Sequence, residues 1–250
     1  MLFIGLKIII VHNYNGVIGA FIMAEDFSVK KIAEIRNGFS DKFGIPRQSG
    51  LCDKVISRIV FEEKYRVAEA VRGLEDFSHI WLIWQFSESV REDWSPTVRP
   101  PRLGGNKRLG VFATRSPFRP NPLGLSCVKL EGIEIDKNLG PVIADSGADL
   151  LDKTPIYDIK PYISYADAKP DATSGFVGTT ERIKLDVSFE KEPNIEADIQ
   201  DALIQILSED PRPAYQSDPD RIYKLDFDGF TVSFKVKETS LTVTEIKEKK

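Results

Sequence analysis

Short runs of alternating or continuous apolar residues dominate the chain from about residue 23 onward. Five runs are rich in β-branched and aromatic residues and are separated by turn-forming residues, which is typical of strands. They cover residues 55–61, 79–86, 109–114, 125–135 and 141–147. This pattern predicts a mainly β chain, folded as a barrel or a sandwich.

One stretch breaks the strand pattern. In YRVAEAVRGLEDF, residues 65–77, apolar side chains recur at helical spacing and a glycine stands near the end. The stretch therefore predicts an amphipathic helix.

The periodicity disappears over residues 165–182, where Pro, Asp, Ser, Thr and Gly gather, as in a linker. Beyond it we expect a strand at 182–189, a helix at 195–210 and a hairpin in which Asp228 and Gly229 separate two alternating runs. These features predict a main domain over residues 23–165, a linker over 166–182 and a small α+β C-terminal domain over 183–250.

The first 22 residues differ from the rest. Lys7, His12 and Asn13 interrupt their apolar runs, which are too short for a membrane helix. They also lack the basic segment and small-residue cleavage site of a signal peptide. We expect residues 1–22 to be an N-terminal extension or a misassigned start.

The 250-residue chain is 42% hydrophobic, so it can bury a substantial core. Cys52 and Cys127 are far apart, without a CxxC pair and with only two histidines in the chain. The sequence therefore predicts neither a disulfide framework nor a zinc site, and a reducing cytoplasm fits best.

Positive charge is concentrated in one segment. The whole chain carries a net charge of −4, but residues 99–126 contain six cations and no carboxylate, which leaves −10 for the remainder. The cations are Arg99, Arg102, Lys107, Arg108, Arg115 and Arg119. Prolines stiffen the loop RSPFRPNPLG, so its arginines can be aimed at an anionic ligand. The alternative is a crossing loop whose arginines cap carbonyls or pair with surface acids.

The sequence lacks the motifs of several common kinds of active site. The chain has no GxG fingerprint and no phosphate loop, and Ser116 and Ser126 do not stand in a nucleophile elbow. His79 fits best as a residue at the start of a strand. The acids of DSGADLLDKTPIYDIKPY, residues 145–162, could bind a ribose diol or an ammonium group, or could simply form turns.

The run TVRPPRLGGNKRLGVFATRSPFRPNPLGLS resembles the TsaA-like family of S-adenosylmethionine-dependent tRNA methyltransferases. FGIPRQSGL at 43–51, AVRGLEDFSHIWLI at 70–83 and DLLDKTPIYDIKPY at 149–162 match the same family, so the resemblance covers roughly residues 28–165. DPRPAY at 210–215 resembles the motif of the family's C-terminal domain.

The resemblance implies a TsaA-like β-barrel that binds S-adenosyl-L-methionine and no metal, acts as a homodimer and has tRNA as its partner. The implied reaction is methylation of N6 of threonylcarbamoyladenosine, at the adenosine immediately 3′ of the anticodon.

The resemblance also implies roles for particular residues. The implied cofactor contacts are Arg47, Gln48, Ser87, Glu88, Arg115, Leu125, Ser146, Gly147, Ala148 and Asp149. The candidates for catalysis are Asp152, as a late proton acceptor, and Asn121. The candidates for binding the modified base and the tRNA are Arg119, Lys160, Tyr162, Arg212 and Tyr215.

Two alternatives stay open at this point. One is an S-adenosylmethionine-dependent methyltransferase acting on a different substrate, and the other is a non-catalytic RNA-binding module. The net negative charge of the chain argues against a nucleic-acid binder, although a dimer would bring two cationic segments together.

Overall fold

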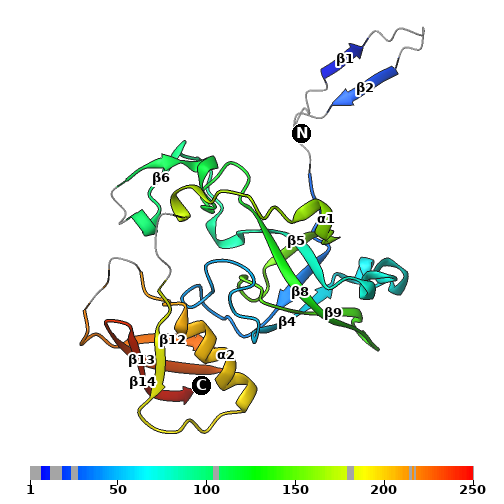
Figure 1. The fold of residues 1–250 in the computed structure, drawn as a ribbon. Coiled ribbons are helices and arrows are strands. Elements are labelled where there is room, and N and C mark those ends of the chain that lie inside the picture. The colour runs from blue at the N-terminus through cyan, green and yellow to red at the C-terminus, as the bar shows by residue number, and fades with distance from the viewer. Residues whose placement is uncertain are drawn as a thin grey trace. The chain divides into compact units, whose positions relative to one another are not determined.

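The computed structural model describes residues 7–11, 19–23, 28–103, 107–178, 183–213, 216 and 218–249. The chain divides into two compact units, residues 1–30 and residues 31–250. In the first, β1 (Lys7–Val11) and β2 (Gly19–Met23) pair as an antiparallel hairpin (Figure 1). No helix in these described parts of the chain is long and apolar enough to cross a membrane.

Six strands of the second unit close into a barrel. In barrel order they are β10 (Pro155–Pro161), β3 (Ala33–Arg36), β4 (Ile56–Phe61), β9 (Gly140–Ser146), β8 (Leu123–Asp136) and β5 (His79–Gln85). All neighbours are antiparallel, and the ring closes because β10 pairs with both β3 and β5. The prediction of a mainly β chain is confirmed.

Alternation along the strands fills the barrel. On β5, Ile80, Leu82 and Trp84 are buried while the residues between them are partly exposed, as expected where successive side chains point to opposite faces. The same holds around the ring, and the interior contains Ala33, Ile35, Ile59, Phe61, Ile80, Leu82, Trp84, Val128, Ile143 and Ile156. Burying a large aliphatic side chain contributes about 1.5–3 kcal/mol, so this interior accounts for much of the barrel's stability.

The helix predicted at 65–77 is wrong. Three short 3-10 turns replace it, at Glu63–Tyr65, Ala68–Val71 and Leu74–Asp76. Val67 has an extended backbone and Gly73 is left-handed, with φ of 84°, so a continuous helix is excluded. The separate turns pack Tyr65, Val71 and Leu74 against the barrel core.

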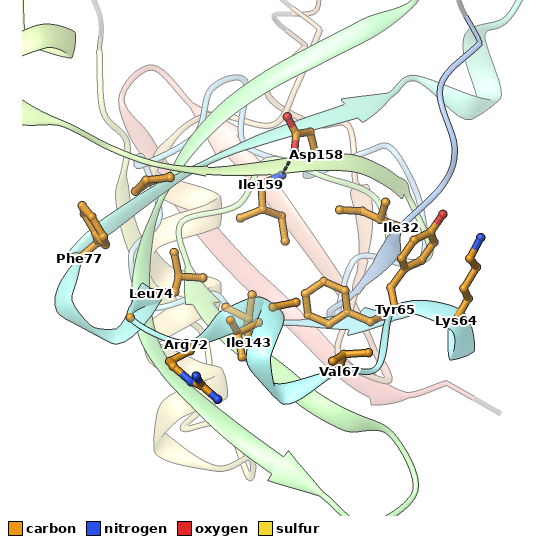
Figure 2. A pocket seen from close by; sticks show the side chains of 15 residues that line it. Ile32, Lys64, Tyr65, Val67, Arg72, Leu74, Phe77, Ile143, Asp158 and Ile159 are labelled. Carbon is orange, nitrogen blue, oxygen red and sulfur yellow. Dashed lines mark hydrogen bonds between the residues drawn. The ribbon is translucent and has the colours of Figure 1, made fainter.

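These turns cover a cavity of about 460 Å³. Figure 2 shows Leu74, Ile143 and Ile159 around the same apolar space, with Lys64 and Arg72 at its edge. None of the site residues predicted from the sequence lines this cavity.

The strand predicted at 109–114 is mostly wrong. Only Leu109–Gly110 forms a strand, β7, which pairs with β6 (Thr97–Val98), and a 3-10 turn follows at Val111–Ala113. The hydroxyl and the backbone N–H of Thr114 both donate to the carbonyl of Val111, which closes the turn. Further 3-10 turns lie at Ser87–Ser89, Pro101–Leu103 and Gly175–Val177.

The C-terminal part is a four-stranded sheet with one helix. Its strand order is β11 (Asp186–Phe189), β14 (Ser240–Glu248), β13 (Phe230–Lys237) and β12 (Tyr223–Phe227), and only the pair β11–β14 is parallel. Figure 1 shows α2 (Ala197–Ser208) against this sheet, and a four-residue helix, α1 (Ser164–Asp167), precedes it in the chain. Asp228 and Gly229 both have positive φ, 47° and 78°, so the predicted two-residue turn of the hairpin is confirmed.

The C-terminal sheet shares its core with the loop between β3 and β4. Phe39, Cys52 and Val55 of this loop are buried in one cluster with residues of α2 and of β12, β13 and β14. The contact is close: a Cβ added to Gly44 would lie 2.3 Å from Leu225. The loop that carries Arg47 and Gln48 is therefore held in place by the C-terminal sheet.

Candidate active site

A cavity of about 620 Å³ lies where four segments of residues 31–250 meet. They are the loop after β3, the end of β5 with the turn that follows it, the proline-rich loop that leads into β8, and the segment between β9 and β10. The residues that line it include Lys42, Arg47, Gln48, Trp84, Gln85, Phe86, Ser87, Glu88, Arg115, Pro117, Arg119, Asn121, Leu123, Gly124, Leu125 and Asp149.

Most of the predicted site residues meet in this cavity, although they come from distant parts of the sequence. Those that line it are Arg47, Gln48, Ser87, Glu88, Arg115, Arg119, Asn121, Leu125 and Asp149. The barrel topology explains the gathering, because β5 pairs with both β8 and β10 and so brings three of the segments to one place.

The proline-rich loop is built from successive short-range hydrogen bonds. The hydroxyl of Thr114 accepts a hydrogen bond from the N–H of Ser116, and the hydroxyl of Ser116 accepts one from the N–H of Phe118. Arg119 donates to the carbonyl of Thr114 at 3.2 Å. Side-chain bonds of this kind fix an irregular backbone, so the loop presents its arginines in defined positions.

Two arginines of the cavity fix the loop after β3, one from outside the loop and one from within it. Arg115 donates a short hydrogen bond to the side-chain carbonyl of Gln48. Arg47 donates to the backbone carbonyls of Asp210 and Arg212, at 3.4 and 2.9 Å. Among the described residues, Arg47 and Arg115 form no ion pair with an acid. Their charges are therefore available to a ligand.

A chain of hydrogen bonds runs from the barrel interior to the cavity. The indole N–H of Trp84 donates to the hydroxyl of Ser126 at 2.9 Å, and this hydroxyl donates to Oδ1 of Asp149 at 2.5 Å. Burial raises the pKa of Asp149, and the hydrogen bond from Ser126 and the charge of Arg115 oppose that rise only in part. Asp149 is thus a carboxylate with a higher proton affinity than an exposed aspartate.

The other carboxylate of the cavity is in a different environment. Glu88 is exposed and forms an ion pair with Lys42, with 3.1 Å between nitrogen and oxygen. Ion pairs between exposed side chains contribute little to stability, so Glu88 can exchange partners when a ligand binds.

Three predicted cofactor contacts lie behind the cavity wall. Ser146, Gly147 and Ala148 are buried and do not line the cavity. Ser146 donates to Glu131 at 2.6 Å, and the carbonyl of Gly147 accepts from the N–H of Gly50 at 2.8 Å. Gly147 has a φ of 81°. In the structure, this turn supports the loop after β3.

Asp152, Lys160 and Tyr162 also lie outside the lining residues. Oδ1 of Asp152 accepts a hydrogen bond from the N–H of Asn37 at 3.1 Å. Lys160 forms an exposed ion pair with Asp158 at 2.9 Å, and the ring of Tyr162 lies 5.9 Å from that of Trp81. The structure therefore does not bring Asp152 to the cavity, in contrast to Asp149.

The DPRPAY motif is described only in part. Arg212 donates two hydrogen bonds to the carboxylate of Asp210, at 2.8 and 2.9 Å, and its guanidinium is mostly buried. Its carbonyl receives the hydrogen bond from Arg47. Tyr215 lies outside the described residues.

Sequence reasoning did not find the aromatic wall of the cavity. Trp84 and Phe86 line it, with ring centroids 4.3 Å apart, and Gln85 accepts a hydrogen bond from the hydroxyl of Tyr157 at 2.6 Å. In the sequence these residues are part of an ordinary strand pattern, and only the pairing of β5 with β8 shows that its end faces a cavity.

Among the described residues, no group of three or more His, Cys, Asp or Glu side chains is placed to hold a metal ion. Cys52 and Cys127 do not form a disulfide bond.

Comparisons with known proteins identify relatives that match most of the chain. The family model described as "tRNA-methyltransferase O N-terminal domain" matches residues 34–168, and that described as "TrmO C-terminal domain" matches residues 183–249.

The chain is 38% identical over 232 residues to the tRNA (adenine(37)-N6)-methyltransferase of Escherichia coli K12, which covers 87% of this chain and 96% of the relative. It is 41% identical over 206 residues to a putative S-adenosylmethionine-dependent methyltransferase of Pseudomonas aeruginosa, covering 78% of this chain and 87% of the relative.

Among solved structures, the crystal structure of TrmO from Pseudomonas aeruginosa is similar with a TM-score of 0.72 and 31% identity. The match covers 89% of this chain and 99% of that one.

Proposed function

The chain belongs to the TrmO family, and from that premise we propose that it methylates N6 of adenosine 37 in tRNA with S-adenosylmethionine as methyl donor. The observation that carries this proposal is the cavity, where nine residues from four segments meet. These residues are nine of those to which the family resemblance assigns a role toward the cofactor or the base.

The cavity suits S-adenosylmethionine in size and in charge. Its volume of about 620 Å³ lies within the range of about 300–1,000 Å³ that is usual for small-molecule sites. The ligand carries a carboxylate, an ammonium group and a sulfonium, and the lining offers guanidinium groups together with carboxylates. We assign Arg47 and Arg115 to the ligand's carboxylate and Glu88 to its ammonium group.

When bound, S-adenosylmethionine supplies an electrophilic methyl group on a sulfonium sulfur. The exocyclic nitrogen of adenine is a poor nucleophile because its lone pair is delocalised into the purine, so orientation of the base dominates the rate. Asn121 and Arg119 line the cavity and are placed to hold the base. Asp149 is the proton acceptor in this proposal, because it lines the cavity and Asp152 does not.

An arginine of the cavity bears on which modification the substrate adenosine carries. A threonylcarbamoyl group on N6 carries a carboxylate, and Arg119 pairs with no acid among the described residues. We therefore propose threonylcarbamoyladenosine as the substrate nucleoside. Lys160, Tyr162, Arg212 and Tyr215 stay predictions as tRNA contacts.

A homodimer completes this proposal. Leu123 and Leu125 line the cavity and are 39% and 57% exposed, so a second copy that covers them would screen the site from water.

We further propose that residues 23–165 and 183–250 are the two domains, joined by 166–182, and that the enzyme works in the cytoplasm.

The variant Arg115→Ala tests the cofactor site. Because a hydrogen bond to a charged group contributes about 1.5–3 kcal/mol, we expect calorimetric titration to show binding of S-adenosylmethionine weakened by about 10- to 100-fold. Arg115 is exposed, so the thermal unfolding midpoint should not change. The matched control is Arg72→Ala, which removes an exposed cation at the other cavity. An unfolded Arg115→Ala variant, or one with normal cofactor affinity, contradicts the assignment.

Nucleoside mass spectrometry separates this function from its two alternatives. Purified protein, S-adenosylmethionine and tRNA isolated from cells lacking this gene should yield an N6-methylated nucleoside at position 37. Cofactor binding without methylation of any tRNA nucleoside would favour a different substrate. Binding of tRNA without any methyl transfer would favour a non-catalytic RNA-binding module.

A further inference from the structure

Two large aromatic side chains are exposed next to the cavity. Trp94 is 51% and Phe112 is 70% exposed, yet their ring centroids lie 6.0 Å apart with 33° between the ring planes. Phe118, in the proline-rich loop that leads into β8, is 38% exposed. Grouped exposed aromatics on a soluble protein usually mark a contact surface.

Arginines lie over these rings. The guanidinium carbon of Arg91 is 3.8 Å from the ring centroid of Phe118, and that of Arg119 is 5.9 Å from the ring centroid of Phe112. Among the described residues neither arginine forms an ion pair with an acid. The two acids nearest in sequence, Glu92 and Asp93, leave a clear cationic excess, since residues 91–126 contain seven cations and two carboxylates.

The aromatic pair is continuous with the site. Arg119 lines the cavity and also lies over Phe112, which in turn contacts Trp94. The backbone between them is held by the hydrogen bonds of Thr114 and Ser116. The ring of Phe112 is therefore fixed relative to the cavity, and the ring of Trp94 lies beside it.

We propose that Trp94 and Phe112 form a stacking platform for unpaired nucleotides of the anticodon loop that flank the base being methylated. This inference rests on the proposed function. Unstacked bases of RNA loops are bound by aromatic rings and guanidinium planes, while neighbouring arginines contact phosphates. Protein–protein contacts are also enriched in aromatic residues and arginine, but the seven cations against two carboxylates in residues 91–126 favour a polyanionic partner.

The test compares the full-length parent with the double variant Trp94→Ala, Phe112→Ala. Since each stacked base contributes about 1–3 kcal/mol by alanine substitution, we expect tRNA to bind about 10- to 100-fold more weakly. The salt dependence of binding should keep its slope, because the rings neutralise no phosphate. Affinity for S-adenosylmethionine should stay at the parent's value. The control is Ile135→Ala, which removes a 66% exposed side chain near the far end of β8.

A second measurement uses fluorescence. Addition of tRNA should quench tryptophan emission, and the quenching should be clearly smaller in Trp94→Phe, which keeps Trp81 and Trp84 of the cavity lining and retains a ring for stacking. Its tRNA affinity should stay within about threefold of the parent's, because a phenyl ring also stacks.

The outcomes separate this inference from the proposed function. If the parent methylates tRNA and the double variant binds tRNA as the parent does, the platform is wrong and the function stands. If the parent binds tRNA with quenching of Trp94 but transfers no methyl group, the platform stands and the function is wrong. If the double variant loses tRNA affinity only together with its dimer in sedimentation, the surface belongs to a second copy of the chain and the inference is overturned.

Discussion

At the scale of single residues, Asp145 stands out because it is buried without a partner. Its side chain has 0% exposure, and neither carboxylate oxygen has a hydrogen-bond partner in the described part of the chain. Ser57, opposite it on β4, is also buried and its hydroxyl also lacks a partner there. Burial, with a smaller contribution from the charge of Glu131, raises the pKa of Asp145 to about 7.

This pKa predicts a pH dependence of stability. Between about pH 4 and pH 7 the unfolded chain loses the proton of Asp145 while the folded chain keeps it, so the unfolding free energy falls as the pH rises and this contribution levels off above pH 7. The raised pKa corresponds to a loss on the order of 4 kcal/mol. Asp145→Asn should abolish this loss, and should therefore gain stability relative to the parent between pH 4 and pH 8 in urea unfolding. If the unfolding free energies of the two proteins change with pH in parallel, Asp145 is not neutral in the folded chain and the prediction is wrong.

At the scale of secondary-structure elements, the sequence predicts well where alternation is long and regular. β4, β5, β8 and β9 lie within two residues of the predicted strands. β10 was not predicted, because it begins and ends with proline and its acids suggested turns.

The candidate site likewise has features that the sequence predicts and features that it does not. The cationic segment and the family motifs lead to the polar residues of the cavity. Its aromatic wall and the pairing of Trp94 with Phe112 depend on contacts between distant segments, which no local pattern contains. The helix predicted at 65–77 failed for a related reason, since its apolar spacing fits separate turns against the barrel equally well.

One strand offers a matched pair of glycine substitutions. A Cβ added to Gly124 would lie 2.2 Å from the ring of Trp84, whereas one added to Gly132, also on β8, would meet nothing within 4 Å. Gly124→Ala should displace the ring and lower the unfolding free energy by about 1–3 kcal/mol. It should also weaken cofactor binding, because Trp84 bonds the Ser126 hydroxyl that holds Asp149. Gly132→Ala should leave both quantities near the parent's values. Equal effects of the two substitutions in urea unfolding and calorimetric titration would show that the contact with Trp84 is unimportant.

At the scale of the whole molecule, the barrel and the C-terminal sheet are joined by a common core. The loop after β3 contributes Phe39, Cys52 and Val55 to that core and also carries Arg47 and Gln48 to the cavity. Gln205 of α2 accepts from the N–H of Lys54 at 2.9 Å. The two parts should therefore unfold as one cooperative unit.

Leu225→Ala tests this coupling. Leu225 is 1% exposed in the C-terminal sheet, and its truncation should cost about 2–5 kcal/mol. All three tryptophans of the chain lie outside that sheet, at positions 81, 84 and 94. In a coupled molecule, the variant lowers the denaturant midpoint seen by tryptophan fluorescence as much as that seen by far-ultraviolet circular dichroism. If the fluorescence transition stays at the parent's midpoint, the two parts unfold independently.

The common core also sets an order of events during synthesis. The loop that carries Arg47 and Gln48 leaves the ribosome early, but β14, which completes the sheet on which it packs, is translated about 185 residues after Val55. At about 5–20 residues per second, that delay amounts to roughly 10–40 s. Throughout it, the nascent chain holds Phe39, Cys52 and Val55 without their final packing partners. The ribosome-bound chain thus passes through a stage with exposed apolar surface, in which the loop that carries Arg47 and Gln48 to the cavity lacks its final packing partners.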